Sequence, residues 1–295
     1  MAETTTQIWT IGQLLSWTQG FLSDKGVEDA RLAAELLLAS ALGCGRVDLY
    51  TRFEQVPAAE QIDRFRELVR EAAGHKPIAY LTGHREFYSL DFLVTPDVLV
   101  PRPETEILVE QAIAAVRGLD RAAHVLDIGT GSGCVAIAIA KLSSAVRMVA
   151  TDISAAALAV AKRNAERNKV DDRITFLEAD AADIASGYVP QGGFDVMVAN
   201  PPYIAATDRD RLPVGIREFE PAIALFGGAD GIDVIRRIAA GGRRLLAPGG
   251  RAFIEMADGQ HERVAAVFGD AGWMIRGVLP DGAGVLRVLA LERGP

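Results

Sequence analysis

The spacing of hydrophobic residues changes along the chain, and each spacing predicts a different kind of secondary structure. In the first eighty residues apolar side chains recur every three or four positions, as in amphipathic helices. Three such stripes are present: Ile11, Leu14, Leu15 and Phe21; Ala33, Leu36, Leu37 and Ala41; and Ile62, Phe65, Leu68 and Val69. Gly43 and Gly74, which follow the second and third stripes, are typical helix ends. The pattern predicts a small helical domain over residues 1–83.

Between Arg85 and Val100 the apolar residues alternate with polar ones, as in β-strands. Pro96-Asp97 lies within this stretch and is a typical turn sequence, so we expect a β-hairpin that turns there. Pro101-Arg102-Pro103 then ends the strand. Residues 84–103 are therefore expected to link the helical domain to a second domain.

From residue 104 onward the pattern predicts a helix over 104–116 and then alternating strands and helices. Strands are predicted at 124–128, 146–151, 173–178, 194–199, 251–256, 273–279 and 285–291, and helices at 133–142, 154–168, 231–246 and 260–270. Such alternation is typical of a mostly parallel sheet with helices on both faces. The last two strands have no helix between them, which predicts an antiparallel hairpin at the sheet edge. Residues 104–295 are thus expected to form one α/β domain.

Composition and charge narrow the class of protein. The 295 residues carry a formal net charge of −8, which argues against binding nucleic acid over a broad surface, because that requires clustered Lys and Arg. Cys44 and Cys134 lie far apart and the four histidines lack ligand spacing, so neither a disulfide framework nor a metal site is expected. Without a recognisable signal peptide or membrane span, we expect a soluble, cytoplasmic protein, most simply a monomer.

A glycine-rich turn follows the first strand of the α/β region. Residues 124–133 combine a strand, a turn with three glycines and the start of a helix. Glycines let the backbone approach a ligand, and the helix start offers free N–H groups. Because position 134 is Cys, the GxGxxG fingerprint of dinucleotide sites is not met. Asp127, directly before the turn, suits a ligand with an ammonium group, such as the methionine part of S-adenosylmethionine.

Acidic residues end the next two predicted strands. Asp152 lies about twenty residues past the glycines, where an acid can accept hydrogen bonds from both ribose hydroxyls. Asp180 ends the third strand, at a position that suits the adenine edge. Each alone could be a turn residue or a cap. Together with the glycine turn they occupy the carboxyl ends of three successive strands, where open α/β sheets bind ligands.

The fourth strand leads into Asn200-Pro201-Pro202-Tyr203. The Asn200 side-chain oxygen and the Pro201 carbonyl could accept the two N–H groups of a planar nitrogen and draw its lone pair toward a methyl group. The prolines stiffen the backbone, and Tyr203 could stack on the flat group. No strong base is required, so catalysis would depend on orientation and electrostatics. A plain turn that closes a strand is the simpler alternative for these residues.

With these motifs the chain resembles, over nearly its whole length, the peptide chain release factor N(5)-glutamine methyltransferases, the HemK or PrmC family. The most specific match is Pro101-Arg102-Pro103-Glu104-Thr105-Glu106. Further likeness lies in residues 77–83, in Arg85-Glu86-Phe87-Tyr88, in Glu220-Pro221 and in residues 227–231.

The resemblance implies three parts: a helical substrate-recognition domain over residues 1–83, a β-hairpin linker over 84–103, and a seven-stranded Rossmann-like methyltransferase domain over 104–295. It implies that S-adenosyl-L-methionine is the cofactor, with S-adenosyl-L-homocysteine as its product. The methyl acceptor would be the side-chain amide nitrogen of the glutamine in the Gly-Gly-Gln motif of bacterial release factors. No direct contact with nucleic acid or with a membrane is expected.

Residue roles follow from the motifs and the resemblance together. The predicted cofactor-binding residues are Asp127, Gly129, Thr130, Gly131, Ser132, Gly133, Asp152, Asp180, Ala181 and Asn200. The predicted catalytic residues, which would hold the glutamine, are Asn200, Pro201, Pro202 and Tyr203. The chain departs from the family pattern at Ala181, where a bulky residue is common, at Ala257 in the stretch where glycine is usual, and in residues 282–286, where polar positions are lost.

Other functions stay open at this level. A nucleic-acid methyltransferase that acts on an exocyclic amine of adenine or guanine must also hold a planar nitrogen. A sister family that methylates a glutamine of a ribosomal protein shares the tetrapeptide, and a binding module without activity could retain the fold. Arg102 and Glu104 are expected either at the mouth of the site or in a salt bridge between domains. Four arginines, Arg236, Arg237, Arg243 and Arg244, are expected on a solvated helix face.

Overall fold

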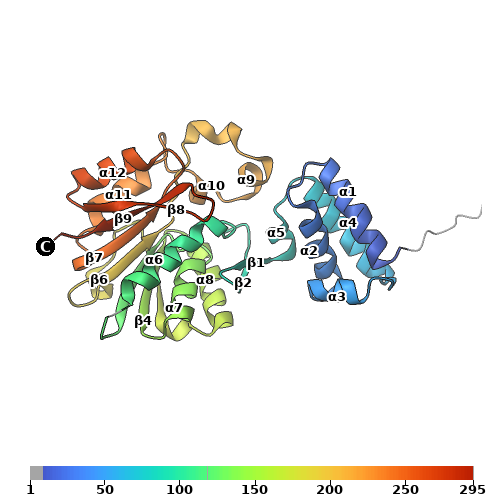
Figure 1. Cartoon of the computed structure of the whole chain (residues 1–295), viewed down its shortest axis with the longest axis horizontal. Helices are drawn as coiled ribbons and strands as arrows, with labels where there is room; N and C mark the ends of the chain where they lie inside the picture. The colour runs from blue at the N-terminus through green and yellow to red at the C-terminus, as the bar shows by residue number, and fades with distance from the viewer. Residues whose placement is uncertain (1–8, 118, 295) are drawn as a thin grey trace, which may run out of the picture. The chain divides into compact units, whose positions relative to one another are not determined.

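The computed structural model describes residues 9–117 and 119–294. It divides into two compact units (Figure 1). The helical unit contains the residues up to Gly83 together with Val214–Phe219, and the α/β unit contains His84–Pro213 and the residues from Glu220 onward. No helix in the described ranges is long and apolar enough to cross a membrane.

The helical unit packs short helices around a leucine-rich core. Its helices are α1 (Ile11–Asp24), α2 (Ala30–Leu42), α3 (Arg46–Thr51), α4 (Ala59–Ala73), α5 (Ile78–Thr82) and α9 (Val214–Phe219). Helix α1 begins where the Thr10 hydroxyl accepts a hydrogen bond from the Gln13 backbone N–H, at 3.3 Å. The three predicted stripes correspond to α1, α2 and α4, whereas α3 and α5 are too short to produce a recognisable period.

The predicted hairpin is present, but its turn lies elsewhere than expected. Strands β1 (His84–Phe87) and β2 (Leu90–Leu93) pair antiparallel around Tyr88 and Ser89, which have φ values of 50° and 57°. The prediction that the hairpin turns at Pro96-Asp97 was therefore wrong, although these two residues do form a separate turn after β2. Two consecutive residues with positive φ form the turn that matches strand twist, and Tyr88-Ser89 lacks the usual Asn-Gly signal. The Tyr88 backbone N–H donates to Glu106 Oε1 at 2.8 Å, which helps to hold this turn in place.

Seven strands form the central sheet of the α/β unit, as predicted. They are β3 (Ala123–Ile128), β4 (Val146–Asp152), β5 (Ile174–Glu178), β6 (Phe194–Ala199), β7 (Leu246–Glu255), β8 (Met274–Pro280) and β9 (Leu286–Glu292). Their spatial order is β5-β4-β3-β6-β7-β9-β8. The last two strands are antiparallel to each other, as expected, and β9 inserts between β7 and β8. The chain reverses its direction of sheet growth between β3 and β6, which creates a topological switch point.

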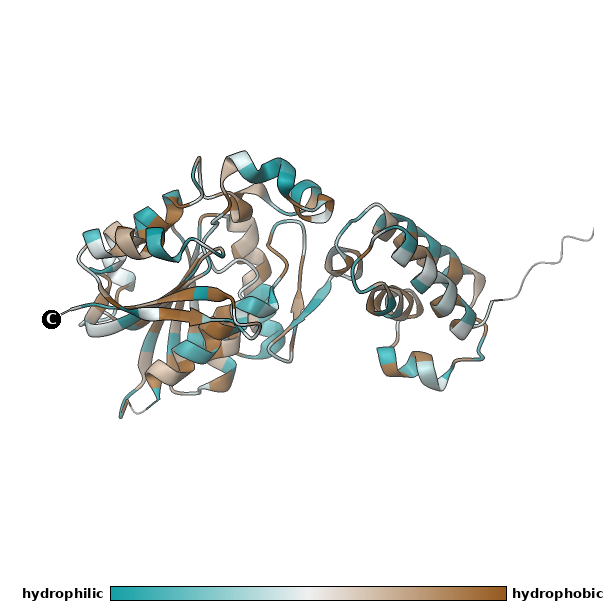
Figure 2. Ribbon diagram, turned by 45° about the horizontal axis from the view of Figure 1, so that its top comes forward, coloured by the Kyte–Doolittle hydropathy of each residue, from teal (hydrophilic) through white to brown (hydrophobic). Residues whose placement is uncertain are grey.

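Helices cover both faces of this sheet (Figure 2). The remaining helices are η1 (Pro103–Thr105), α6 (Glu106–Val116), α7 (Cys134–Leu142), α8 (Ala155–Asn168), η2 (Asp171–Arg173), η3 (Ser186–Tyr188), η4 (Ala206–Arg211), α10 (Ala222–Leu225), α11 (Asp233–Gly242) and α12 (His261–Asp270). Helices α6 and α7 share one core with Val196 and Val198, while α11 and α12 share another with Met197 and Ala199. Consecutive residues of β6 thus point to opposite faces, and both faces are buried.

One helix prediction in this unit was too long. The apolar pattern predicted a helix over 231–246, yet α11 ends at Gly242 and β7 begins at Leu246. Leu245 and Leu246 are buried, but they belong to the approach and first residue of the strand, where Leu246 pairs with Phe194. Periodicity alone cannot separate a helix end from a buried strand that follows it closely.

Candidate active site

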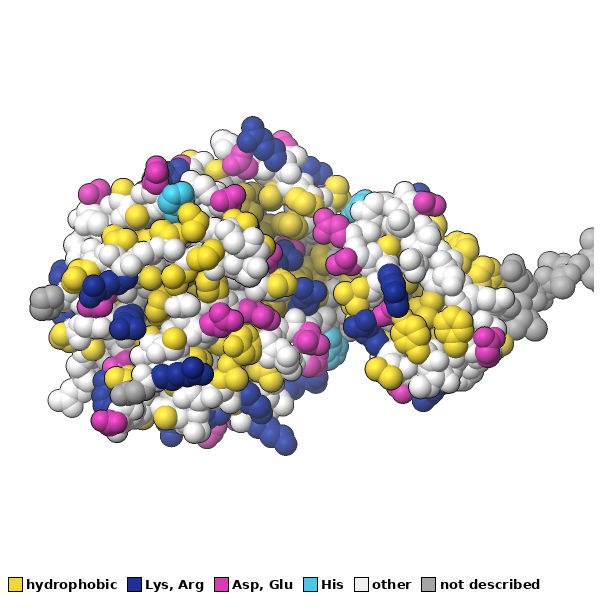
Figure 3. All heavy atoms as spheres, viewed as in Figure 1, with side chains coloured by type: hydrophobic (Ala, Val, Ile, Leu, Met, Phe, Trp, Pro, Cys, Tyr) yellow, Lys and Arg dark blue, Asp and Glu magenta, His cyan; other side chains and the backbone are white. Residues whose placement is uncertain are grey.

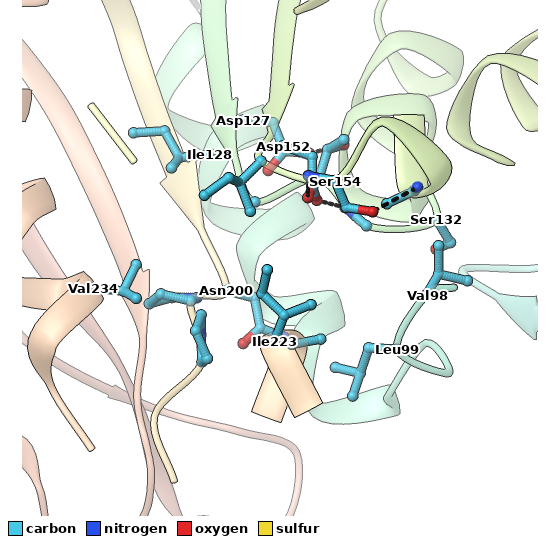
Figure 4. Close-up of a pocket in the computed structure, with 18 of the residues that line it drawn as sticks. Val98, Leu99, Asp127, Ile128, Ser132, Asp152, Ser154, Asn200, Ile223 and Val234 are labelled. Atoms are coloured by element: carbon cyan, nitrogen blue, oxygen red, sulfur yellow. Dashed lines mark hydrogen bonds between the residues drawn. The ribbon is translucent and has the colours of Figure 1, made fainter. Parts of the chain in front are cut away.

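A cavity of about 320 Å³ opens at the carboxyl ends of β3, β4, β5 and β6, at the topological switch point (Figure 4). Residues from all four strand ends line it, together with the segment after the hairpin and the N-terminal part of α11. Of the residues predicted for the site, those lining the cavity are Asp127, Gly129, Thr130, Gly131, Ser132, Asp152, Asp180, Ala181, Asn200, Pro201 and Pro202. The cavity lies entirely within the α/β unit.

The glycine turn wraps the amino end of α7. Gly129, Gly131 and Gly133 all have positive φ, at 73°, 55° and 82°. Gly133 lies off the cavity lining, and a Cβ there would come within 2.9 Å of Ile137 Cδ1 and 3.1 Å of Ala161 Cβ. The third glycine therefore lets two helices pack closely behind the turn, and the first two shape the surface that faces the cavity.

Asp127 lies at the floor of this turn and is 2% exposed. Its Oδ2 accepts a hydrogen bond from the Thr130 hydroxyl at 2.7 Å. Burial raises the pKa of Asp127 to about 7, and the negative charge of Asp152 acts in the same direction, whereas the hydrogen bond from Thr130 opposes the shift. A buried carboxyl beside a second acid favours a cationic group in the cavity.

Asp152 fastens the turn to the second strand. Its Oδ2 accepts from the Gly131 backbone N–H and its Oδ1 from the Ser154 backbone N–H, each at 2.9 Å (Figure 4). Burial raises the pKa of Asp152, and these backbone hydrogen bonds favour its charged form. Each carboxylate oxygen retains a further lone pair for a ligand that enters the cavity.

The third strand end and α11 meet at the rim of the cavity. Asp180 accepts a hydrogen bond from Arg237 Nη1 at 2.5 Å, and both side chains are about half exposed. Arg237 is half exposed, in line with the expected solvated helix face, and it also lines the cavity. Ala181, beside Asp180, is buried with a φ of 50°, a conformation that L-residues seldom adopt.

Apolar side chains to which the sequence assigned no role also line the cavity. Val98 and Leu99 come from the segment after the hairpin, Ile223 from α10 and Val234 from α11 (Figure 4). None of them belongs to a motif with chemical meaning, and only the fold brings these four together. A cavity with a polar floor and an apolar wall is typical of sites for small organic ligands.

The tetrapeptide continues directly from β6 and is held from several sides. Asn200 Nδ2 donates to Thr105 Oγ1 at 3.0 Å, and Gln260 Nε2 donates to the Tyr203 carbonyl at 2.9 Å. A Cβ at Gly227 would lie 2.4 Å from the Pro202 carbonyl oxygen, and one at Gly231 would lie 2.6 Å from the Tyr203 carbonyl oxygen. These glycines are needed because the chain packs against the tetrapeptide without room for a side chain.

Tyr203 itself lies off the cavity lining, with its ring against the core that α11 and α12 cover. Burial raises the pKa of its hydroxyl, and the nearby charge of Glu255 raises it further. Its hydroxyl is 3.5 Å from Glu255 Oε1. Stacking of Tyr203 on a flat substrate group stays a prediction.

Asn164, which sequence reasoning passed over, and Arg102 with Glu220, which it had named, help to hold the site together. Asn164 of α8 is fully buried, and its Nδ2 donates to the carbonyls of Ser132 and Leu93, each at 2.9 Å. Arg102, expected at the mouth of the site or in a salt bridge between domains, lines the cavity and forms an ion pair with buried Glu220 inside the α/β unit. Arg102 and Glu220 could be found because both lie in motifs that match the family. Asn164 could not, since an asparagine in a helix carries no signal of its own.

Cysteine and metal chemistry receive no support within the described ranges. Cys44 and Cys134 are both free thiols. Burial raises the pKa of Cys134 to about 12, so its thiol stays protonated and unreactive near neutral pH. Residues 9–117 and 119–294 contain no cluster of three or more His, Cys, Asp or Glu side chains that could hold a metal ion.

Comparison with known proteins relates each unit, and the chain as a whole, to known families. Residues 13–83 match the family model of the PrmC N-terminal domain, and residues 104–216 match that of the methyltransferase small domain. A solved methyltransferase from Pyrococcus furiosus is similar in fold, with a TM-score of 0.52 at 20% identity, over 77% of this chain and 98% of that one.

Two relatives match over nearly their full lengths. The chain is 45% identical to the release factor glutamine methyltransferase of Rhodopirellula baltica, over 99% of this chain and 100% of that protein. It is 43% identical to the release factor glutamine methyltransferase of Geobacter sulfurreducens, over 96% of each. The chain therefore belongs to the release factor glutamine methyltransferase family.

Proposed function

We propose that this enzyme transfers a methyl group from S-adenosyl-L-methionine to the side-chain amide nitrogen of the glutamine in the Gly-Gly-Gln motif of a peptide chain release factor. The observation that carries the proposal is the orientation of the Asn200 side-chain amide. Its amide nitrogen is engaged by Thr105 while the residue lines the cavity, so its side-chain oxygen is the group left for a ligand. An acceptor at this point suits an amide N–H.

The cofactor half of the cavity fits S-adenosyl-L-methionine in size and charge. A volume of about 320 Å³ is within the range of small-molecule sites. Asp127 would receive the ammonium group, Asp152 the ribose hydroxyls, and the Asp180–Ala181 corner the adenine. The cofactor supplies an electrophilic methyl group on a positively charged sulfur.

Catalysis by the residues of this chain then consists of binding and orientation. The Asn200 oxygen and the Pro201 carbonyl would accept the two N–H groups of the glutamine amide, which turns the nitrogen lone pair toward the methyl group. The rigid Pro201-Pro202 backbone keeps these acceptors in place. As the methyl group is transferred, the acceptors stabilise the positive charge that develops on the nitrogen, and the excess proton leaves afterwards.

The proposal is tested by transfer of labelled methyl groups to purified release factor. We expect label on the wild-type factor, mass-spectrometric localisation of the methyl group to the glutamine of Gly-Gly-Gln, and no label on a factor whose tip glutamine is replaced by alanine. Free nucleic acid and ribosomal protein serve as parallel acceptors. Label on either of these, with none on the release factor, would overturn the proposed substrate.

We further propose that the helical unit recognises the body of the release factor. Support comes from large apolar side chains that stand exposed at and just after α3, namely Val47, Tyr50, Phe53 and Val56. Hydrophobic side chains gather on the visible face of this unit (Figure 3). Exposed apolar groups of this kind mark sites of protein–protein contact.

A charged substitution separates recognition from chemistry. Val47→Glu should raise KM for the intact release factor by roughly tenfold, as loss of one buried contact does, and leave a short Gly-Gly-Gln peptide unaffected. Leu142→Glu is the matched control, since Leu142 is an exposed apolar residue of α7 in the α/β unit. An equal rise in KM with the short peptide would refute a role in binding the body of the factor.

A further inference from the structure

A fully buried asparagine lies behind the glycine turn, outside the lining of the cavity. Asn164 belongs to helix α8, where asparagine favours helix formation less than alanine does. Burial of an amide is also costly unless its polar atoms are hydrogen-bonded. The Asn164 side chain forms three hydrogen bonds, all to backbone groups, and these groups belong to two separate segments of the site. This arrangement indicates that Asn164 contributes to the architecture of the site rather than to the helix.

The first of these segments is the end of strand β2. Asn164 Oδ1 accepts a hydrogen bond from the Leu93 backbone N–H at 2.7 Å, and Asn164 Nδ2 donates to the Leu93 carbonyl at 2.9 Å. A primary amide carries an acceptor and a donor in one plane, so it completes both backbone hydrogen bonds of one strand residue, as a neighbouring strand would. The double contact also fixes the orientation of the amide, because its oxygen must face the Leu93 N–H group.

The second segment is the glycine turn. Asn164 Nδ2 also donates to the Ser132 carbonyl, at 2.9 Å, and Ser132 is a buried residue that lines the cavity. Helix α8 approaches the turn closely because Gly133 has no side chain, since a Cβ there would lie 3.1 Å from Ala161 Cβ. Both N–H groups of the Asn164 amide are thus used, one for the hairpin and one for the turn. A single side chain connects the two segments.

The strand end that Asn164 holds continues into the lining of the cavity. Residues 94–100 follow it directly, and Val98 and Leu99 among them line the cavity (Figure 4). The far end of this lining segment is held by buried Glu220, whose Oε2 accepts a hydrogen bond from the backbone N–H of the last residue at 3.4 Å. The position of the two apolar side chains therefore depends on two anchors that lie outside the cavity.

We propose that Asn164 is a positioning residue, which sets the distance between the lining segment and the glycine turn and thereby the fit of the cavity to the cofactor. The inference rests on the proposed function, because this distance matters for activity only if the cavity binds S-adenosyl-L-methionine. The cofactor would meet polar groups at the turn and apolar ones at Val98 and Leu99. Asn164 then contributes to cofactor affinity without contacting the cofactor.

Removal of the Asn164 amide should act on affinity and not on turnover. Asn164→Ala should weaken S-adenosyl-L-methionine binding by about tenfold, which corresponds to the loss of one well-packed apolar contact. The kcat at saturating cofactor should stay within about threefold, because the residues that orient the methyl acceptor are unchanged. Partial unfolding would do the opposite: it would lower the apparent kcat and leave the Kd of the folded molecules unchanged. That result would overturn the inference.

A neighbouring asparagine provides the matched control. Asn168 lies one turn further along α8, and its Nδ2 donates to the carbonyl of Asp91 in β2 at 3.4 Å and to that of Asn164 at 3.0 Å. Neither of these bonds involves the glycine turn. Asn168→Ala should therefore leave the cofactor Kd within about twofold. An equal loss of affinity in the two alanine variants would mean that the hairpin needs only general support from α8, which would overturn the specific role of Asn164.

A double-mutant cycle tests whether Asn164 acts through the lining segment. Leu99→Ala alone should weaken cofactor binding by about tenfold, because an apolar contact is lost. If Asn164 acts by holding Leu99 in place, the double variant should bind only about as weakly as the weaker of the two single variants. Losses that multiply to about 100-fold would show two independent effects and would overturn the proposal. Asn164→Asp, which keeps the side-chain volume but lacks the amide donors, replaces the alanine variant if that variant folds poorly.

Hydrogen exchange without cofactor distinguishes failure of this inference from failure of the proposed function. In the free enzyme the Val98 amide, which donates to the Thr95 carbonyl at 3.1 Å, should exchange about tenfold faster in Asn164→Ala than in wild type or in Asn168→Ala. If it does so but the release factor is not methylated, the positioning role stands and the substrate assignment fails. If the factor is methylated but the exchange rate at Val98 is the same in all three proteins, the positioning role is wrong.

Discussion

The two halves of the cavity are built by different physical means. In the cofactor half, backbone groups form most of the binding surface. Glycines with positive φ shape a turn, and the Asp152 carboxylate accepts hydrogen bonds from two backbone N–H groups. In the acceptor half, side chains from distant parts of the sequence hold one another, as Asn200 is held by Thr105. The first half is local in sequence, and the second depends on the whole fold.

This difference has consequences for how each half fails. A substitution in the cofactor half removes one of several contacts to a large ligand, so binding should weaken by a limited factor. A substitution in the acceptor half misplaces a group that acts in the transition state, so turnover should fall while binding is preserved. The predictions below test this separation, beginning with the largest effect.

Removal of the acceptor side chain should have the largest effect. We expect Asn200→Ala to lower kcat by about 10²- to 10³-fold, as loss of one preorganised transition-state contact does in other enzymes. Cofactor binding measured by calorimetry should change by less than about threefold, because the cofactor half is intact. A parallel loss of turnover and cofactor affinity would show that the two halves are not separable.

Loss of the ribose-facing acid should act on binding instead. We expect Asp152→Ala to weaken S-adenosyl-L-methionine binding by about 10- to 100-fold, since hydrogen bonds to a charged group are lost on both the ligand and loop sides. The kcat at saturating cofactor should change little. Asp183→Ala is a suitable control, because Asp183 is an exposed acid whose closest basic partner, Arg244, is 3.8 Å away. An unchanged Kd in Asp152→Ala would exclude the ribose contact.

The same contrast explains what could be read from the sequence. The glycine turn, Asp127 and Asp152 are close to strand ends and obey a simple rule about where α/β sheets bind ligands. Asn200 was found because it directly follows a predicted strand and begins the distinctive segment Asn200-Pro201-Pro202-Tyr203. Its hydrogen bond to Thr105 was not found, because the two residues are 95 positions apart in the chain and meet only in the folded structure.

The fold shows a similar limit. Long elements with a clear period were predicted within a few residues, and all seven strands of the sheet were identified, although β7 begins at Leu246, five residues before its predicted start at 251. The errors fell where a local choice is decided by packing. The hairpin turns at Tyr88-Ser89 because Phe87 and Phe92 on either side are buried in the core, while Pro96-Asp97 forms a separate turn after β2. Burial of this kind decides which turn joins the two strands, and it cannot be seen before the partners are known.

A smaller effect than that of Asp152→Ala is expected from the protonation of Asp127, which should change cofactor affinity alone. Its pKa of about 7 is raised by burial, so the carboxyl is largely neutral below pH 7 and charged above it. A cationic ligand needs the charged form, and the apparent affinity should follow the ionised fraction. We expect binding to be about fivefold weaker at pH 6 than at pH 7.

A rise in pH changes the stability of the fold and the affinity for the cofactor in opposite directions. Since the folded pKa of Asp127 lies above the unfolded value, this group stabilises the fold at low pH, and its contribution is lost as the pH rises through 7. Calorimetry of wild type and Asp127→Asn, by ligand titration for affinity and by thermal unfolding for stability, tests the direction of both pH effects. The variant should bind weakly at either pH and show no pH dependence between 6 and 7, and a persistent fivefold change in the variant would assign the effect to another group.

The smallest effect is expected at the rim, where Arg237 holds Asp180. Both side chains are about half exposed, and exposed ion pairs contribute little because solvent screens them. We expect Arg237→Ala to change cofactor Kd by less than about threefold, mostly by freeing Asp180 to reorient. Arg236→Ala, whose arginine pairs with Asp230 and Asp233 away from the cavity lining, is the matched control and should leave Kd unchanged. A loss of tenfold or more in Arg237→Ala would mean that the rim arginine contacts the ligand directly, so the cofactor half would then also depend on a side chain supplied from a distant helix.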